Sequence, residues 1–197
     1  MRQLQTLYLF TFFFLLLFLF PFSSVFPRAV HQLIYQICVF LLLLFSSLNT
    51  SAQKRTRRGW KKPRALHMAE AALLALCTLG AGLLLRPAEL PPGMFSTSLP
   101  LLTAMAGLAA LSEELFFRCW LLSEFTAAGF SFWHIACISS LVFASLHLWE
   151  GVSAALLACI TGIIYCAAFR RWGSLWPLFT AHLLHNFAAL LWNRLQV

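Results

Sequence analysis

The sequence predicts an all-α polytopic membrane protein with about seven transmembrane helices. Of its 197 residues, 61% are hydrophobic and only 10% are charged, against about 25% charged residues in an average soluble domain. A chain of this size cannot bury so much apolar surface in its own core, so lipid is the expected solvent. All six acidic residues are Glu. The absence of Asp excludes aspartyl intramembrane proteolysis and any Ser-His-Asp triad.

Seven apolar segments approach the roughly 20 residues that a helix needs to cross a bilayer. They cover residues 7–26, 32–49, 66–85, 99–123, 131–149, 151–169 and 173–193. The first segment lacks a small-x-small cleavage site, so we expect an uncleaved span rather than a signal peptide. The first two segments consist almost wholly of Phe, Leu, Ile and Val and carry no candidate chemistry. We therefore predict an accessory transmembrane hairpin over residues 1–53.

A basic cytoplasmic loop is predicted over residues 54–64, between this hairpin and a core over residues 65–197. The loop holds seven cations, Lys54, Arg55, Arg57, Arg58, Lys61, Lys62 and Arg64. Basic runs also bind nucleic acid, but here the flanking spans favour the positive-inside rule. The rule places the N-terminus in the cytoplasm and brings Arg170 and Arg171 to the same side. The bilayer is thus an expected partner, and nucleic acid is not.

Glu113 and Glu114 lie midway along the segment 99–123, after the small-residue run Ala104–Ala110. Small residues let neighbouring helices enclose a polar site. Glu114 and Arg118 are four residues apart and can pair on one helix face, whereas Glu113 points about 100° away. We therefore predict Glu113 as a general base supported by the pair of Glu114 and Arg118. The alternative is an ion pair that only locks two helices together.

Two further patterns add imidazoles and an amide to the predicted core. Phe143-x-x-x-His147 places a histidine where it could hold a water molecule jointly with Glu113; the alternative is a core histidine bonded to a backbone carbonyl. His182-x-x-x-Asn186 places two hydrogen-bond donors on one helix face, suited to a tetrahedral oxyanion. We predict the last four spans to enclose these groups in a polar cavity.

A zinc site is the alternative for the same side chains, because His and Glu are ordinary zinc ligands. His147, His182, His185 and Glu113 would then be the ligand set. The sequence contains no His-Glu-x-x-His pattern, and His182 and His185 stand only three residues apart. We therefore expect no metal and no other cofactor.

The three patterns, Glu-Glu-x-x-x-Arg, Phe-x-x-x-His and His-x-x-x-Asn, occur intact and in this order within residues 99–193. In this respect the chain resembles the CPBP family of CAAX proteases and bacteriocin-processing enzymes, also called the Abi family. The resemblance implies a glutamic-type, metal-independent intramembrane endopeptidase of the CAAX prenyl protease 2 kind. It implies that Glu113 and His147 activate water, and that His182 and Asn186 stabilise the oxyanion. Glu114, Arg118 and Phe143 are then supporting residues.

The substrate implied by the resemblance is a membrane-anchored protein or peptide, cut at a CAAX end, a leader peptide or a C-terminal sorting signal. The compact chain looks more like the bacterial forms, so we expect the bacterial cytoplasmic membrane as its location. A non-catalytic scaffold or immunity protein of the same family remains an alternative. A proton-coupled transporter is a further one, disfavoured by the lack of repeated halves with broken helices.

The predicted depth of the site residues is inconsistent at one point. If a helix spans 131–149, His147 lies near its outer end, while Glu113 and His182 lie near mid-membrane. At about 1.5 Å per residue, the mismatch is roughly 10 Å. Either this helix begins earlier, or it is tilted or partly re-entrant.

Overall fold

The computed structural model describes residues 59–85 and 98–195, and all regular elements in these two ranges are helices. In chain order they are α4 (Ala65–Leu85), α5 (Leu99–Glu114), η3 (Leu115–Leu121), α6 (Leu122–Ala127), α7 (Phe132–Ser145), η4 (Leu148–Glu150), α8 (Val152–Trp172) and α9 (Trp176–Leu195). The predicted all-α class is thus confirmed for the described ranges. The predicted hairpin over 1–53 and the basic residues up to Arg58 lie outside them.

Within the described ranges, three helices are long and apolar enough to cross a membrane: α4, α8 and the continuous helix Leu99–Ala127. That continuous helix, here called the long helix, joins α5, η3 and α6 over 29 residues. Of the other two predicted spans in these ranges, α7 has only 14 residues. The last, α9, has 20 residues but is less apolar. The count of seven is therefore not confirmed.

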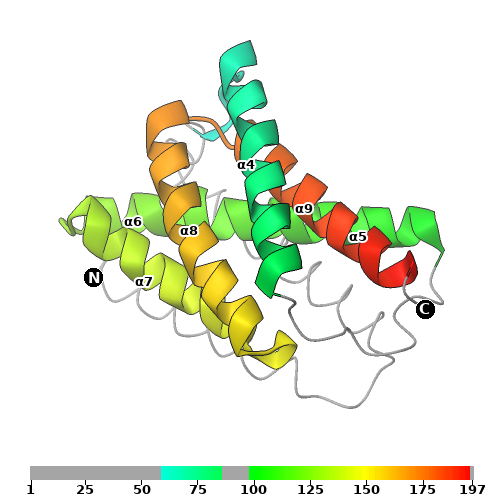
Figure 1. Cartoon of the computed structure of the whole chain (residues 1–197). Helices are drawn as coiled ribbons and strands as arrows, with labels where there is room; N and C mark the ends of the chain where they lie inside the picture. The colour runs from blue at the N-terminus through cyan, green and yellow to red at the C-terminus, as the bar shows by residue number, and fades with distance from the viewer. Residues whose placement is uncertain (1–58, 86–97, 196–197) are drawn as a thin grey trace.

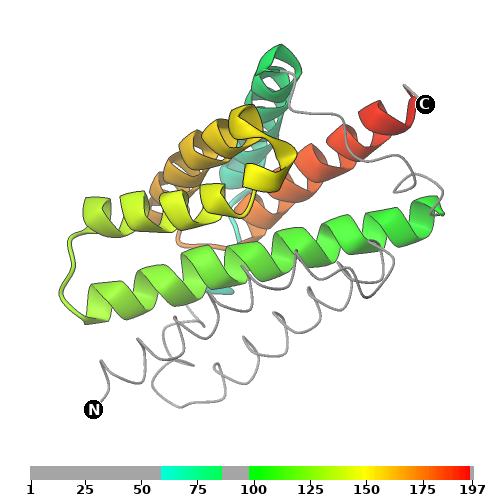
Figure 2. The same ribbon diagram turned by 90° about the horizontal axis from the view of Figure 1, so that it is seen from below.

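The long helix is the element on which the others are arranged. Helices α4 and α8 cross it (Figure 1), running antiparallel to each other and packing together. Figure 2 shows α7 beside the C-terminal part of the long helix and α9 beside its N-terminal part. The middle of the long helix therefore faces the end of α7 and the body of α9.

The short helix α7 accounts for the depth mismatch in the sequence prediction. After the turn at Gly129, α7 runs back along the long helix for 14 residues, or about 21 Å. The stretch from Ala127 back to Glu113 also measures about 21 Å at the same rise. Because these two lengths are equal, His147, just beyond the end of α7, lies beside Glu113 when measured along the long helix. Helix α7 is therefore shorter than the predicted span over 131–149, which is not confirmed.

A close approach of α7 and α8 holds the end of α7 in place. A Cβ atom at Gly162 would lie 2.8 Å from the Ser140 hydroxyl oxygen and 3.1 Å from the Ser140 Cα atom. Only glycine avoids this overlap, so the two helices pack backbone to backbone, as small residues allow in membrane proteins. The main buried cluster extends from this contact to η3, with Phe117, Leu121 and Phe143 among its members.

Candidate active site

The centre of the site is an ion pair inside the long helix. Arg118 Nε lies 3.2 Å from Glu114 Oε2, and the two side chains are 1% and 0% exposed. The pair spans the point at which the helix changes from α to π geometry, since η3 begins at Leu115. Wide π turns are rare and occur often at functional sites. The spacing of four residues predicted this pair, and the structure places it as predicted.

His182 of α9 joins both glutamates of the long helix. Its Nδ1 lies 2.8 Å from Glu114 Oε1 and its Nε2 lies 3.6 Å from Glu113 Oε2. Glu114 forms an ion pair with Arg118, and a carboxylate in an ion pair only accepts hydrogen bonds. His182 Nδ1 therefore carries the hydrogen and donates it to Glu114. The sequence placed His182 with Asn186 alone, and this double contact with the glutamates was not predicted.

The two adjacent glutamates have different surroundings. The Glu114 side chain is sealed between Arg118 and His182, whereas the Glu113 side chain is 20% exposed. No ion pair links Glu113 to an arginine among the residues that the structure describes. An accessible carboxylate can meet water and substrate, and a sealed one cannot. The geometry thus separates one accessible carboxylate from one that is buried between Arg118 and His182.

Three aromatic rings surround the buried guanidinium group. Arg118 Cζ lies 5.1 Å from the Phe143 ring centroid, 5.3 Å from that of Tyr165 and 5.7 Å from that of Phe117. All three guanidinium nitrogens of Arg118, and Glu114 Oε2, find no hydrogen-bond partner in the described part of the chain, so their 3.2 Å contact is an ion pair without a hydrogen bond. Rings within about 6 Å stabilise a cation electrostatically. They take the place of the missing acceptors and leave Glu114 as the one anion in contact with Arg118.

Tyr165 is a site neighbour that the sequence analysis missed. It lies in α8, is 2% exposed, and its ring centroid is 6.0 Å from that of His182 in an edge-on arrangement. Tyr165 therefore contacts both Arg118 and His182 from a helix without a recognised motif. A single hydroxyl-bearing ring in an otherwise apolar span was the available signal.

Phe143 separates the two imidazoles of the site. Its ring centroid lies 4.7 Å from that of His147 and 6.1 Å from that of His182. Its carbonyl oxygen lies 3.0 Å from His147 Nδ1. A carbonyl oxygen can only accept, so His147 Nδ1 carries the hydrogen and Nε2 keeps its lone pair. The alternative of a carbonyl-bonded histidine is thus realised, and the same bond leaves the other ring nitrogen able to accept a proton.

A tight turn follows α7 and carries His147. Leu146 and His147 bond back to Phe143 and Ala144, and the Glu150 N–H bonds to the His147 carbonyl at 3.0 Å. Gly151 closes the turn at φ 111°, ψ 164°, a conformation that is essentially restricted to glycine. Glu150 interacts electrostatically with both His147 and Glu113. It is a third carboxylate near the site, and the sequence analysis assigned it no role.

The remaining predicted residues lie along α9. Asn186 is half-buried one helical turn beyond His182. His185 turns toward α4, where a Cβ atom at Gly82 would lie 3.7 Å from its Cε1 atom. Within residues 59–85 and 98–195, no three His, Cys, Asp or Glu side chains form a group that could hold a metal ion. His182 instead directs both nitrogens at carboxylates.

Comparison with known proteins identifies one relationship. Residues 95–188 match the family model described as type II CAAX prenyl endopeptidase Rce1-like. The matched segment contains all three sequence patterns and confirms the resemblance that they indicated. No curated protein and no solved structure matches the chain.

Proposed function

We propose a function that starts from this comparison: residues 95–188 match the model of the type II CAAX prenyl endopeptidase Rce1-like family. This is a protease family, and together with the three long apolar helices found in residues 59–85 and 98–195 it indicates an integral membrane protein. The proposed activity is the hydrolysis of a peptide bond in a membrane-embedded or lipidated substrate by a glutamic-type, metal-independent mechanism. The bacterial cytoplasmic membrane, with the N-terminus inside, is the proposed location.

The observation that carries the proposal is the different environment of the two neighbouring glutamates. Glu114 is buried, with an ion pair to Arg118 and a hydrogen bond from His182. Glu113 is accessible and 3.6 Å from the second nitrogen of the same imidazole. Glu113 is therefore free to take a proton from water while its neighbour fixes the surrounding charges. A pair that only locked helices together would not need the second, partly open carboxylate.

In the proposed reaction a water molecule is held between Glu113 and the His147 Nε2 lone pair. Its oxygen attacks the scissile carbonyl carbon, one of its protons passes to the Glu113 carboxylate, and the carbonyl electron pair moves to oxygen. On collapse, the carbon–nitrogen bond breaks and the departing amine nitrogen takes up that proton. General acid–base catalysis of this kind contributes about 10²–10⁴-fold to the rate.

The oxyanion is assigned to His182 and Asn186 in this scheme. Because His182 Nδ1 donates to Glu114, Nε2 can donate only if it also carries a hydrogen. The imidazole is then a cation, and the four charges of Glu113, Glu114, Arg118 and His182 cancel. A neutral group of this kind avoids the cost of an unpaired charge inside a membrane protein.

The substrate proposed for the first test is a peptide that ends in a prenylated Cys and three further residues. The full chain is reconstituted in vesicles, and release of the three-residue product is measured for wild type, Glu113→Gln and His147→Ala. Each substitution is expected to lower kcat by about 10²–10⁴-fold. A chelator is expected to leave wild-type turnover unchanged, and the same peptide without the prenyl group tests whether lipidation matters.

The matched control is Glu124→Gln, the same chemical change on the same long helix but 11 residues from Glu113. It is expected to keep wild-type turnover. Full turnover by the Glu113→Gln chain would refute the proposal and leave the scaffold alternative. Activity lost on chelation and restored by zinc would instead support a zinc-dependent protease.

A further inference from the structure

A dense group of basic side chains lies where α4 begins and α8 ends. Its described members are exposed and come from two distant parts of the chain: Lys61, Lys62, Arg64, Arg170 and Arg171, here called the basic surface. Two hydrogen bonds hold these parts together. The Ser174 hydroxyl donates to the Lys61 carbonyl at 2.7 Å, and the Leu175 N–H donates to the Gly59 carbonyl at 2.6 Å. The two basic stretches that the sequence separates by about a hundred residues thus form one surface.

Glu70, an acidic residue beside the basic surface, already has partners for both carboxylate oxygens. One Glu70 carboxylate oxygen lies 2.6 Å from Arg171 Nη2, and the other accepts a hydrogen bond from Trp172 Nε1 at 2.6 Å. Lys61, Lys62 and Arg64 form no ion pair with any residue in the described ranges. The basic surface therefore carries several positive charges that are available to bind anions from outside the chain.

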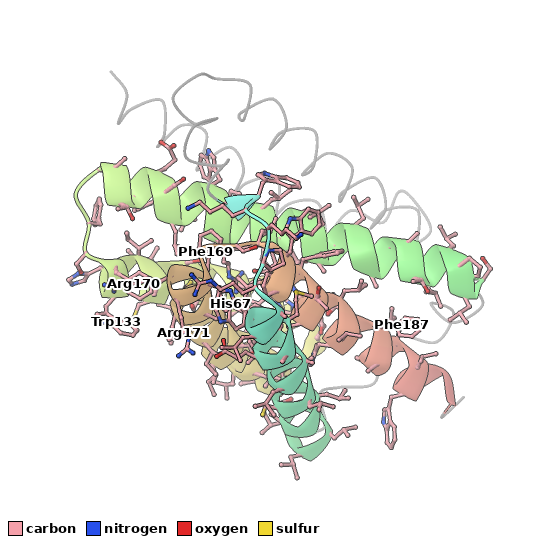
Figure 3. The ribbon with its side chains drawn as sticks, turned by 90° about the horizontal axis from the view of Figure 1, so that it is seen from above. His67, Trp133, Phe169, Arg170, Arg171 and Phe187 are labelled. Atoms are coloured by element: carbon pink, nitrogen blue, oxygen red, sulfur yellow. The ribbon has the colours of Figure 1, made fainter. Side chains whose placement is uncertain are left out.

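Aromatic side chains border the same surface. Trp60 and Trp133 are 43% and 60% exposed, and the Arg170 guanidinium lies 4.5 Å above the Phe132 ring. Figure 3, seen from this end of the molecule, shows Arg170 and Arg171 near Trp133 on one face. Exposed Trp beside Lys and Arg is typical of the level at which a protein meets lipid headgroups.

We infer that the basic surface binds the phosphate groups of anionic phospholipids at this membrane face. Clusters of Lys and Arg next to transmembrane helices attract acidic headgroups, and each cation near the surface contributes measurably. Here the cations stand at the ends of two apolar helices, α4 and α8, so the headgroup layer is where they reside. Nucleic acid would also supply phosphates, but the exposed Trp side chains and the adjoining spans favour lipid.

The test uses the full chain purified in a neutral detergent and titrated with phosphatidylglycerol or phosphatidylcholine, with bound lipid counted by native mass spectrometry. Wild type is expected to bind phosphatidylglycerol more tightly, and added salt should weaken this preference. The double substitution Lys61→Gln/Lys62→Gln should lower the phosphatidylglycerol binding constant by roughly thirtyfold. Binding of phosphatidylcholine should not change.

The control is Arg194→Gln, which removes one positive charge near the C-terminal end of α9, and it is compared with the single substitution Lys61→Gln. Arg194 stands 18 residues after the first residue of α9, about 27 Å along the helix. An equal loss of phosphatidylglycerol binding in the control would overturn the inference, as would equal binding of both lipids by wild type. Displacement of the lipid by a DNA duplex at equal phosphate concentration would identify nucleic acid as the ligand instead. Because peptide cleavage is not the readout, failure here leaves the proposed protease function untouched.

Discussion

The two histidines of the site are held by different kinds of structure. His182 lies within α9, is 6% exposed, and is fixed by two glutamates from the long helix. His147 lies beyond the end of α7 and is fixed by a carbonyl four residues earlier and by the turn up to Gly151. One region depends on charges that compensate one another across helices. The other depends on local backbone geometry.

This difference indicates how each region should fail. Removing one member of a buried charge pair leaves the other unpaired in a low-dielectric interior, so stability falls steeply. Distorting the turn after α7 costs less, because few buried contacts depend on it, yet it displaces the imidazole. We therefore expect the first region to couple stability to activity, and the second to affect activity more than stability.

The largest effect is expected where the charge compensation is broken. Arg118→Met leaves Glu114 buried with His182 as its one remaining partner, and should lower the free energy of unfolding by about 3–5 kcal/mol. The measurement is reversible unfolding in mixed detergent micelles. The double change Glu114→Gln/Arg118→Met should recover most of the loss. If the double variant is no more stable than the single one, the pair does not act through charge compensation.

A smaller effect is expected from straining the turn. Gly151→Ala introduces a side chain at φ 111°, at a cost of about 1–3 kcal/mol, and should lower kcat because His147 moves. Gly80→Ala in α4 is the matched control, since a Cβ atom there meets nothing within 4 Å. The control should keep its activity and gain up to about 1 kcal/mol from better helix propensity. Unchanged kcat in Gly151→Ala would show that the turn does not position the imidazole.

The smallest effect is expected at Tyr165, which tests how the region around His182 and Arg118 is supported. Tyr165→Leu removes a ring that contacts both Arg118 and His182, a contact of about 0.5–2 kcal/mol. We expect kcat to fall by roughly 2–30-fold with KM unchanged, because Tyr165 acts through these two side chains. Tyr165→Phe keeps the ring and should remain close to wild type. Equal damage in both variants would show that the hydroxyl group, not the ring, is what matters.

The spacing of residues along the sequence predicted pairs within one helix, but it did not predict the contacts between helices. The i,i+4 rule gave the Glu114–Arg118 pair, because both residues belong to one helix. The same rule paired His182 with Asn186 and could not predict that His182 reaches two glutamates 68 and 69 residues earlier in the chain. Tyr165 and Glu150 were overlooked because they approach the site from α8 and from a turn, where no pattern marks them.

The length of α7 also could not be predicted from the sequence. Its apolar run continues to Trp149, so hydropathy predicted a full span, whereas the helix ends at Ser145. The turn at Gly151 and the close contact of Gly162 with Ser140 fix where the chain reverses. The π turns of η3 are likewise set by packing, since no local propensity distinguishes them from α geometry.

The sequence by itself determined the all-α class of this protein, the residue types of its candidate site and the family model that residues 95–188 match. Composition and periodicity are sufficient for that, because the lipid environment and the helix repeat act on every residue alike. Only the tertiary structure decided that α7 stops midway, that one imidazole serves two carboxylates and that two distant basic stretches share a surface. These features depend on contacts between helices far apart in the chain, which local patterns do not encode.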